Sequence, residues 1–323
     1  MSNSAKQIYI LCYPGFQLLD VAGPADVFAQ ANQELGKEVY TLRYIAEEEK
    51  LASASGLPIV CEPLSVCEAP VDYLFVPGAN ADPLFAASER EAFISWIAEV
   101  APHADTLCSV CSGSLLLAKA GLLEGKRITS HWAALSHLEQ MCPASTVLEN
   151  NLYVNDGQLW TSAGVLAGVD MALALVARDH NHSLALRIAK NLLAFMFREG
   201  HQPQLSLPIS LQEKASDTSL LKLIKWLQDN LAEPINVEAM ADHMATSVRS
   251  LHRYCQDSLH LSPAKMFNEL RLEQAKTLLG DKDIPIKQIA SECGFADSSA
   301  FSKAFSQRHQ LSPLQYRHRL YGV

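Results

Sequence analysis

Apolar positions in the first two thirds of the chain follow two alternating patterns. Short apolar runs and alternating segments, several of which lead directly into small-residue or proline turns, predict strands at residues 8–12, 39–45, 57–60, 73–76 and 106–110. Residues 88–100 place apolar side chains at helical spacing, and residues 18–29, which contain Gly23-Pro24, are predicted as a loop that leads into a helix. Strands that alternate with helices predict a parallel sheet covered on both faces.

A hairpin and two helices are predicted next. Residues 153–155 and 159–161 lie on either side of Asp156-Gly157, a pair typical of a type I′ hairpin turn. Two largely apolar helices follow at residues 168–180 and 183–197. One of their faces suits packing on the sheet, and we hypothesise that another forms the surface of a homodimer.

A change in composition divides the chain. Residues 199–216 hold two prolines and show no sustained periodicity, as expected of a linker. We therefore expect a first domain at residues 1–198 and a second domain at residues 217–323.

The second domain is predicted to be all-α. The expected helices lie at residues 219–231, 236–244, 247–258, 263–279 and 286–293, with one more after Asp297. Ser262 and Pro263 begin the longest of them, which ends at Gly280 and spans roughly 25 Å. Gly294, which tolerates positive φ, and Asp297, a suitable N-cap, mark a tight turn. These signals predict two helix-turn-helix units, at residues 235–258 and 285–309.

The two units share one sequence pattern, fifty residues apart. Each has an apolar, a basic and an apolar residue at the same spacing, followed by Leu-Ser-Pro. The matching pairs are Leu251 and Phe301, Arg253 and Lys303, and Cys255 and Phe305. A single amphipathic helix pair is usually an ordinary hairpin with a solvated polar face. The repeat favours a duplicated functional module instead.

The last hundred or so residues resemble the DNA-binding domain of the AraC family of bacterial transcription regulators. The resemblance rests on the repeat and on the segment IASECGFADSSAFSKAFSQRHQLSPLQYR. It implies two recognition helices, braced by a long helix, that enter successive major grooves about 34 Å apart. The implied base and phosphate contacts come from Arg249, His252, Arg253, Ser298, Ser299, Lys303 and Arg308.

Charge is distributed unevenly between the two domains. The net charge is −9: residues 1–216 hold 13 Lys+Arg against 23 Asp+Glu, and residues 217–323 hold 13 against 12. From residue 298 onward the basic residues Lys303, Arg308, Arg317 and Arg319 are accompanied by no acidic residue, which predicts an electropositive tail. DNA binding must therefore depend on local clusters of the second domain.

Composition limits the class of protein. A chain of 323 residues suits two separate cores, and 49% apolar residues indicate a globular protein. The N-terminal residues lack the features of a secretory signal, so we expect a cytoplasmic protein. The eight cysteines are scattered, which predicts reduced thiols; Cys108 and Cys111 form a C-x-x-C without a second pair. Neither a metal nor a cofactor is predicted.

Cys111 occupies a sharp turn between a strand and a helix. The strand at residues 106–110 runs into Cys111-Ser112-Gly113 and then into a helix at residues 114–120. Such a turn directs one side chain toward the helix N-terminus, where amides lower a thiol pKa and stabilise an oxyanion. The arrangement is that of a nucleophile elbow with Cys in place of Ser. The alternative is that Cys111 is one more buried cysteine.

This elbow, LLDVAGP at residues 18–24 and the segment TSHW at residues 129–132 make residues 7–198 resemble the ThiJ/PfpI superfamily. The resemblance implies a class I glutamine amidotransferase-like fold, an α/β flavodoxin-like parallel sheet. It also implies one pocket that holds Asp20, Cys111 and His131, with Ser112 beside the thiol. Ala79 stands where enzymes of the group commonly have glycine, and its Cβ restricts φ and narrows the pocket.

Two functions from different classes follow from these observations. The first is a sequence-specific transcription regulator, an activator and not an enzyme, whose first domain senses a small molecule or dimerises. Its partners would be double-stranded DNA, the transcription machinery and an effector, for which an acid and a thiol suggest a nitrogenous metabolite. The alternative is a cysteine-dependent hydrolase or hydratase with Cys111 as nucleophile and Asp20 as proton shuttle. A third hypothesis is redox sensing by a Cys111 thiolate. Two DNA-reading units favour the regulator.

Overall fold

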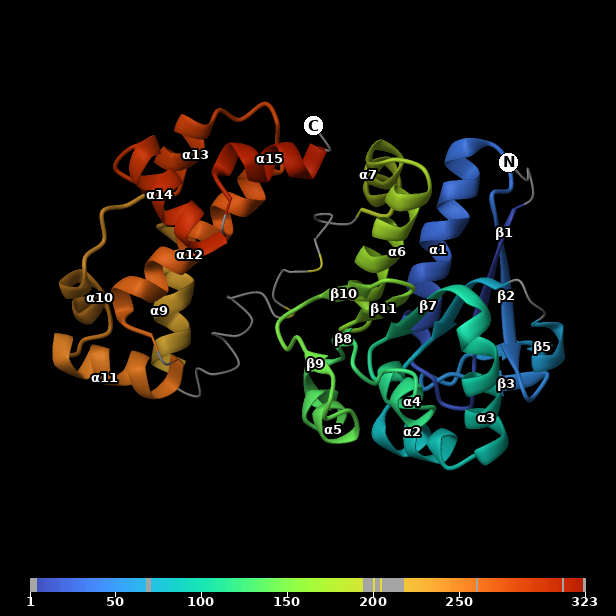
Figure 1. Ribbon diagram of the computed structural model, residues 1–323. Helices are drawn as coiled ribbons and strands as arrows, with labels where there is room; N and C mark the ends of the chain where they lie inside the picture. Colours follow the sequence, from blue (N-terminus) through green and yellow to red (C-terminus); the bar gives the residue numbers. More distant parts are fainter. Residues whose placement is uncertain are drawn as a thin grey trace. The chain divides into compact units, whose positions relative to one another are not determined.

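The chain forms two compact units, Met1–Gln204 and Leu205–Val323 (Figure 1). The computed structural model describes residues 5–67, 71–193, 200, 204, 218–259, 261–309 and 311–321. Of the predicted linker at residues 199–216, Gly200 and Gln204 are described and the rest lies outside the described residues. No helix in these ranges is both long enough and apolar enough to cross a bilayer.

The first unit is built on a seven-stranded sheet with the order β10-β11-β7-β6-β1-β2-β5. Its strands are β1 (Lys6–Leu11), β2 (Tyr40–Ala46), β5 (Glu62–Pro63), β6 (Val71–Val76), β7 (Ala104–Val110), β10 (Tyr153–Asp156) and β11 (Leu159–Ser162). β10 and β11 pair antiparallel, and the other neighbours pair parallel. The central strands are buried on both faces, which explains their continuous apolar runs. The predicted parallel sheet is confirmed.

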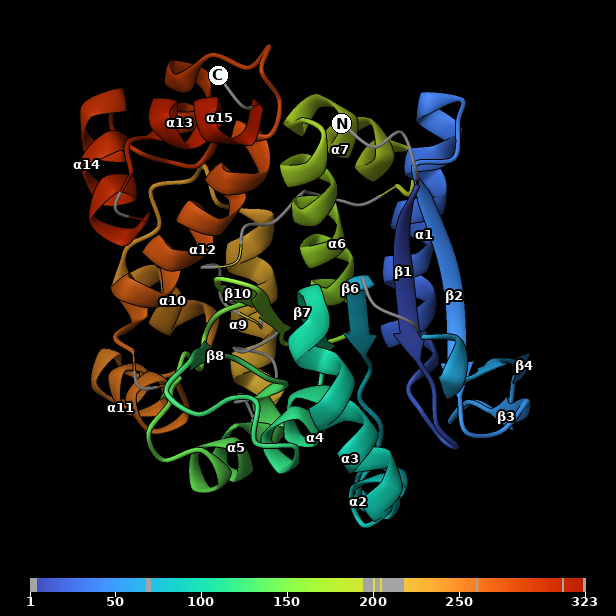
Figure 2. The same ribbon diagram turned by 45° about the vertical axis from the view of Figure 1, so that its right-hand side comes forward.

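Helices cover both faces of this sheet (Figures 1 and 2). One group consists of α1 (Leu18–Leu35), α6 (Leu166–Asp179) and α7 (His182–Asn191), which pack against one another. The other consists of α2 (Ala81–Ser88), α3 (Glu91–Val100), α4 (Gly113–Lys119) and α5 (Leu135–Met141). The crossover through α1 leads from β1 to β2, whereas the crossover through α2 and α3 leads from β6 to β7, in the opposite direction along the sheet. Right-handed crossovers in opposite directions place these helices on opposite faces.

Short elements complete the unit. Two small sheets pair β3 (Lys50–Ala52) with β4 (Pro58–Val60) and β8 (Arg127–Ile128) with β9 (Thr146–Val147). The 3-10 helices are η1 (Leu64–Val66), η2 (Ala101–His103) and η3 (Trp132–Ala134). The turns that follow β6 and β7 at their carboxyl ends carry the candidate site.

Of the loop and helix expected at residues 18–29, the helix is present and the loop at its start is not. α1 begins at Leu18 and passes through Gly23 and Pro24 without interruption. Close packing on α6 explains this: a Cβ added to Gly23 would lie 2.9 Å from Cγ2 of Val169, and Pro24 is buried. Tertiary contact therefore outweighs the low helix propensity of the pair.

Three other boundaries differ from expectation. The helix expected at residues 88–100 begins at Glu91, because Ser88 ends α2. The hairpin register pairs Asp156 with Leu159, so its loop is Gly157-Gln158, and Gly157 alone of the two has positive φ, unlike a type I′ turn. α7 ends at Asn191, and residues 194–197 of the expected helix lie outside the described residues.

The described part of the second unit is helical. It contains α9 (Thr218–Asp229), α10 (Val237–His243), α11 (Val248–Leu259), α12 (Pro263–Leu279), α13 (Ile286–Glu292), α14 (Ser298–His309) and α15 (Pro313–Tyr321). The predicted caps are present: the Ser262 side chain accepts from the amide of Lys265 at 3.3 Å, and that of Asp297 from the amide of Ala300 at 2.7 Å. Gly294 has φ of 71°, as predicted. The two helix-turn-helix units and the long helix between them are confirmed.

Two hydrophobic cores lie along α12. Phe267 and Leu270 belong to one core with α9, α10 and α11, whereas Leu272, Ala275 and Leu279 belong to another with α13, α14 and α15. The longest helix is thus shared by both helix-turn-helix units, which positions them relative to each other.

Candidate functional site

Cys111 sits at the carboxyl end of β7 in a strained conformation. Its φ is 58°, a value that non-glycine residues adopt rarely and mostly at functional turns. The turn needs glycine on either side: a Cβ on Gly164 would lie 2.8 Å from Cys111 Sγ, and one on Gly78 would lie 2.9 Å from Cys111 Cβ. The sharp strand-to-helix turn expected from the sequence is therefore present.

The Asp20 carboxylate is held beside this thiol. It accepts hydrogen bonds from the amides of Val165 at 2.9 Å and Gly78 at 3.1 Å, and it lies close enough to the Cys111 thiol for each group to shift the pKa of the other. Burial raises the pKa of Asp20 to about 6, although its hydrogen bonds act in the opposite direction. Asp20 and Cys111, both singled out in the sequence, thus meet in one buried site.

The Cys111 thiol is not activated. Burial, followed by the nearby Asp20 carboxylate, raises the pKa of Cys111 to about 12, although hydrogen bonds from Ser112 lower it. The thiol is protonated at neutral pH and can donate to Asp20. The expectation that the helix N-terminus lowers this pKa below its usual range is wrong, because desolvation and the carboxylate outweigh the amides.

Ser112 and Ala79 bond to each other across the turn. The Ser112 hydroxyl donates to the Ala79 carbonyl at 2.9 Å and accepts from the Ala79 amide at 3.1 Å. The Ala79 amide, one of the two that could bind an oxyanion beside a nucleophile elbow, therefore already has a partner.

His131 directly follows Ser130 in the TSHW segment, and its contacts lie within the start of η3. It caps η3, with Nδ1 accepting from the amide of Ala133 at 3.4 Å, and its ring centroid lies 5.3 Å from that of Trp132. Burial lowers the pKa of His131. Within the described residues, no hydrogen bond joins His131 to Cys111 or Asp20.

Ser130, which the sequence analysis did not single out, supports the elbow instead. Its hydroxyl donates to the Cys111 carbonyl at 3.0 Å and accepts from the Ser114 hydroxyl at 2.7 Å. Its own carbonyl accepts from Nε2 of Gln204 at 2.8 Å. A buried serine beside a histidine carries no distinctive sequence signal, so its part in the site appears only in the structure.

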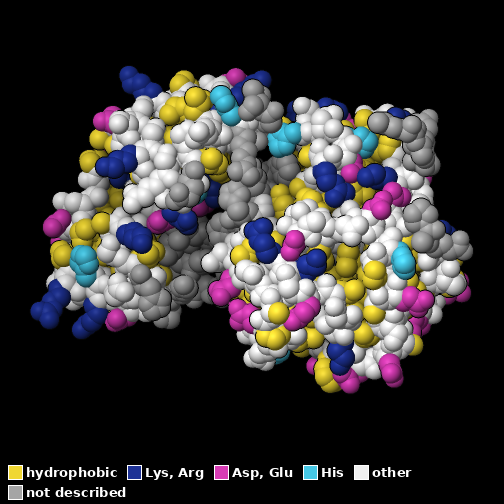
Figure 3. All heavy atoms as spheres, viewed as in Figure 1, with side chains coloured by type: hydrophobic (Ala, Val, Ile, Leu, Met, Phe, Trp, Pro, Cys, Tyr) yellow, Lys and Arg dark blue, Asp and Glu magenta, His cyan; other side chains and the backbone are white. Residues whose placement is uncertain are grey.

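The candidate DNA-contacting residues lie on the exposed sides of α11 and α14. Leu251, Cys255, Phe301 and Phe305 are buried. The candidates on the opposite sides are exposed, except for the half-buried Ser298; they are Arg249, His252, Arg253, Ser299, Lys303 and Arg308. Figure 3 shows Lys and Arg side chains projecting from the surface of the helical unit. The structure thus presents basic groups where the sequence predicted them.

The predicted electropositive tail is smaller than expected. Arg317 is 9% exposed and donates to the carbonyl of Ile284 at 2.7 Å, so it is part of the core. The side chain of Arg319 lies outside the described residues. Arg308 is exposed but paired with Glu269 of α12 at 2.7 Å. Lys303 is therefore the clearest basic candidate on α14.

Two protein-family models match the chain. Residues 240–319 match a helix-turn-helix domain, and residues 6–178, more than half of the chain, match the DJ-1/PfpI family. The chain belongs to the DJ-1/PfpI family. It combines the DJ-1/PfpI domain with a C-terminal helix-turn-helix domain of the AraC type, as both resemblances implied.

Relatives of this DJ-1/PfpI protein include regulators and an enzyme. The HTH-type transcriptional regulator GbdR of Pseudomonas aeruginosa is 28% identical over 317 residues, which cover 98% of this chain and 85% of that protein. Isonitrile hydratase of Pseudomonas putida is 37% identical over 174 residues, 53% of this chain and 71% of that enzyme. A solved ThiJ/PfpI family protein from Pseudomonas syringae has a TM-score of 0.56 at 28% identity, covering 69% of this chain and 87% of that one.

Proposed function

We propose that this DJ-1/PfpI protein is a sequence-specific transcription regulator whose first domain binds a small-molecule effector without converting it. The observation that carries the proposal is the repeated helix-turn-helix pair, whose apolar sides form two cores and whose basic sides are exposed. The similarity to GbdR, a regulator, over nearly the whole chain supports it. Double-stranded DNA is then the principal partner.

The effector pocket is proposed to lie at Asp20, Ala79, Cys111, Ser112 and His131. With a pKa of about 6, Asp20 is mostly ionised at pH 7.5. A buried carboxylate beside a neutral thiol favours a ligand with a cationic nitrogen, because the ligand then pairs with a charge already removed from water. We therefore propose a nitrogenous metabolite as effector. A homodimer and activation through the transcription machinery belong to the same proposal.

DNA recognition is tested by selecting duplexes from a random pool with the full chain. We expect a discrete consensus sequence and footprint, and weaker binding after Arg253→Ala. Recovery of duplexes with no shared sequence would remove the regulator function.

The effector pocket is tested by a thermal-shift screen of amines, betaines and amino acids. A compound that binds the native first domain raises its unfolding temperature. We expect the hit to act on wild type and to lose its effect in Asp20→Asn. A hit whose shift survives that substitution would place the ligand elsewhere.

Catalysis is the second candidate, and the similarity to isonitrile hydratase is the observation that favours it. Against it stand the raised pKa of Cys111 and the engaged amide of Ala79. The first would slow attack by the thiol, and the second would take one donor away from an oxyanion. The same pKa speaks against redox sensing through a thiolate. We expect no turnover of an isonitrile by wild type; turnover abolished by Cys111→Ser would establish the enzyme.

A further inference from the structure

Arg271, in the middle of α12, makes a polar contact at the junction of the two cores. Arg271 follows the last residue of the first core, Leu270, and precedes Leu272 of the second. Its Nε donates to the carbonyl of Leu231 at 2.9 Å, and its Nη2 donates to the carbonyl of Glu233 at 2.7 Å. Both carbonyls belong to the segment that leads from α9 into the first helix-turn-helix unit.

The Arg271 guanidinium also packs over an aromatic ring. Its centre lies 4.1 Å from the ring centroid of Phe267, one turn earlier on α12. A planar fork that binds two carbonyls and lies over a ring has one orientation, whereas the rotatable donors of a lysine ammonium impose no fixed geometry. The contact therefore fixes the loop relative to α12.

The second helix-turn-helix unit reaches this contact through Gly294. A Cβ on Gly294 would lie 2.2 Å from the Leu231 carbonyl oxygen and 2.6 Å from Nη2 of Arg271. At the equivalent turn of the first helix-turn-helix unit, the residue is Ala245, which is exposed. Glycine in the second turn is thus needed for close approach as well as for its positive φ. The loop before one unit, the turn of the other and Arg271 meet at one point.

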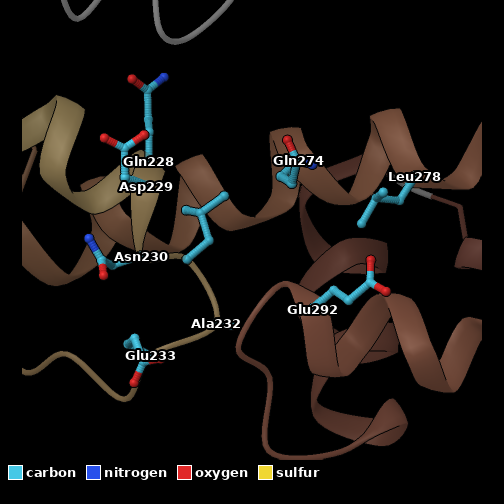
Figure 4. Close-up of a pocket in the computed structure, with 9 residues that line it drawn as sticks. Gln228, Asp229, Asn230, Ala232, Glu233, Gln274, Leu278 and Glu292 are labelled. Atoms are coloured by element: carbon cyan, nitrogen blue, oxygen red, sulfur yellow. The ribbon is translucent and has the colours of Figure 1, made fainter.

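Space beside this point is not filled. A pocket of about 340 Å³ opens between the end of α9, α12 and α13 (Figure 4). Gln274 and Leu278 of α12, Glu292 of α13 and Glu233 of the loop line it. Because apolar packing does not continue there, the polar contact at Arg271 adds to the packing along α12 in holding the two helix-turn-helix units in register.

We propose that Arg271 is a positioning residue for DNA recognition, which sets the spacing and angle between α11 and α14. This inference rests on the proposed function. When two recognition helices are held rigidly, both can bind one duplex only if its two sites have the same spacing as the helices. Loosening the joint should therefore relax the preferred spacing while leaving each helix able to bind its own site.

The experiment compares full-length wild type with Arg271→Lys, Arg271→Ala and the matched control Gln274→Ala, which alters the same pocket on the same helix. The probes are a duplex selected by wild type from a random pool, the same duplex with one or two base pairs inserted between the sites, and a duplex with one site. We expect wild type to prefer the selected spacing by at least about tenfold.

In Arg271→Lys and Arg271→Ala this preference should fall below about threefold, while affinity for the single-site duplex changes by less than about twofold. Gly294→Ala perturbs the same contact from the second helix-turn-helix unit and should reduce the spacing preference in the same way. Gln274→Ala should behave as wild type. The unfolding midpoint of each variant confirms that the second unit is folded.

Two results would overturn the positioning role. One is a wild-type spacing preference in folded Arg271→Lys and Gly294→Ala. The other is an equal loss of affinity for all duplexes, including the single-site duplex, which would mark Arg271 as a general stabilising residue. If wild type itself selects no duplex, the proposed function fails and the role of Arg271 falls with it.

Discussion

At the scale of single residues, the protonation states of Asp20 and Cys111 decide what this site can do chemically. Desolvation acts on both groups, but Asp20 is compensated by two backbone amides, whereas the thiol faces the carboxylate. Asp20 therefore ionises first and the thiol remains a donor. The site suits recognition of a polar ligand better than nucleophilic attack.

The raised pKa of Asp20 predicts a pH-dependent stability. Its folded value of about 6 exceeds the ordinary 3.8, so protonated Asp20 stabilises the fold below about pH 4, and this contribution is lost as pH rises through 6. Relative to Asp20→Asn, which does not titrate, wild type should lose up to about 3 kcal/mol of unfolding free energy between pH 4 and 7. Urea unfolding of both proteins across this range measures it; a constant difference would contradict the assignment.

Ala245 is a position where a substitution should stabilise the protein. Its φ is 49°, in the left-handed region, and its side chain is exposed, so its Cβ brings strain without packing. Ala245→Gly should raise the unfolding free energy by about 0.5–1 kcal/mol. The control Ala239→Gly, inside α10, should lower it by about 1 kcal/mol. Thermal unfolding compares them, and destabilisation by Ala245→Gly would refute the strain.

Local sequence reveals some members of the site and hides others. Cys111 and Asp20 are found because a strand-turn-helix signal and the LLDVAGP segment mark them. Ser130 and Val165 contribute through hydrogen bonds to residues 19 and 145 positions away, and no local pattern carries that information. The pKa of Cys111 likewise follows from burial, which the sequence does not specify.

At the scale of elements, α14 carries two basic residues in different situations. Lys303 is exposed, whereas Arg308 is bonded to the largely buried Glu269 and so links α14 to α12. An ion pair that is already formed has less to gain from a phosphate. The two residues should therefore contribute unequally to DNA affinity.

We expect Lys303→Ala to weaken binding to the selected duplex about tenfold. If Lys303 contacts a phosphate, the slope of log affinity against log salt should also fall by about one. Arg308→Ala should have a smaller effect on affinity and a larger one on the stability of the second unit. Fluorescence anisotropy at several salt concentrations decides; a larger effect of Arg308→Ala on affinity would reverse the assignment.

Element boundaries were predicted best where caps fix them. Ser262, Pro263 and Gly280 delimit α12 as expected, because capping is a local interaction. The start of α1 was missed, since Gly23 and Pro24 are helical only through their contacts with α6. Propensity describes isolated segments, and packing decides the rest.

At the scale of the whole molecule, the last described residue of the first unit is tied to the candidate pocket. Nε2 of Gln204 donates to the carbonyls of Ser130 at 2.8 Å and Glu149 at 2.9 Å. Ser130 in turn bonds to the backbone of Cys111. The end of the DJ-1/PfpI domain and the cysteine turn thus share one support.

Gln204→Ala should lower the unfolding free energy of the first domain by about 1 kcal/mol, because two carbonyls, that of Ser130 partly buried, lose their donor. Differential scanning calorimetry should show a shift in the transition of that domain alone. Gln140→Ala, on the exposed side of α5, is the control and should leave both transitions in place. An unshifted transition in Gln204→Ala would show that the contact is weak.

The division of charge and pattern predicted two domains of different class, and the structure contains both. Composition and periodicity are averages over many residues, so they survive local errors. The predicted boundaries at 198 and 217 remain predictions, since most of residues 199–216 lies outside the described residues.

The mutual bonds of Ser112 and Ala79 also bear on how this scaffold could gain or lose an activity. With glycine in place of Ala79, the amide at that position would still be satisfied by the Ser112 hydroxyl. A designer who wanted turnover would have to remove that hydroxyl as well. The raised pKa of Cys111 would remain, because that hydroxyl is one of the groups that lower it, so freeing the Ala79 amide alone would not give the site a reactive thiol.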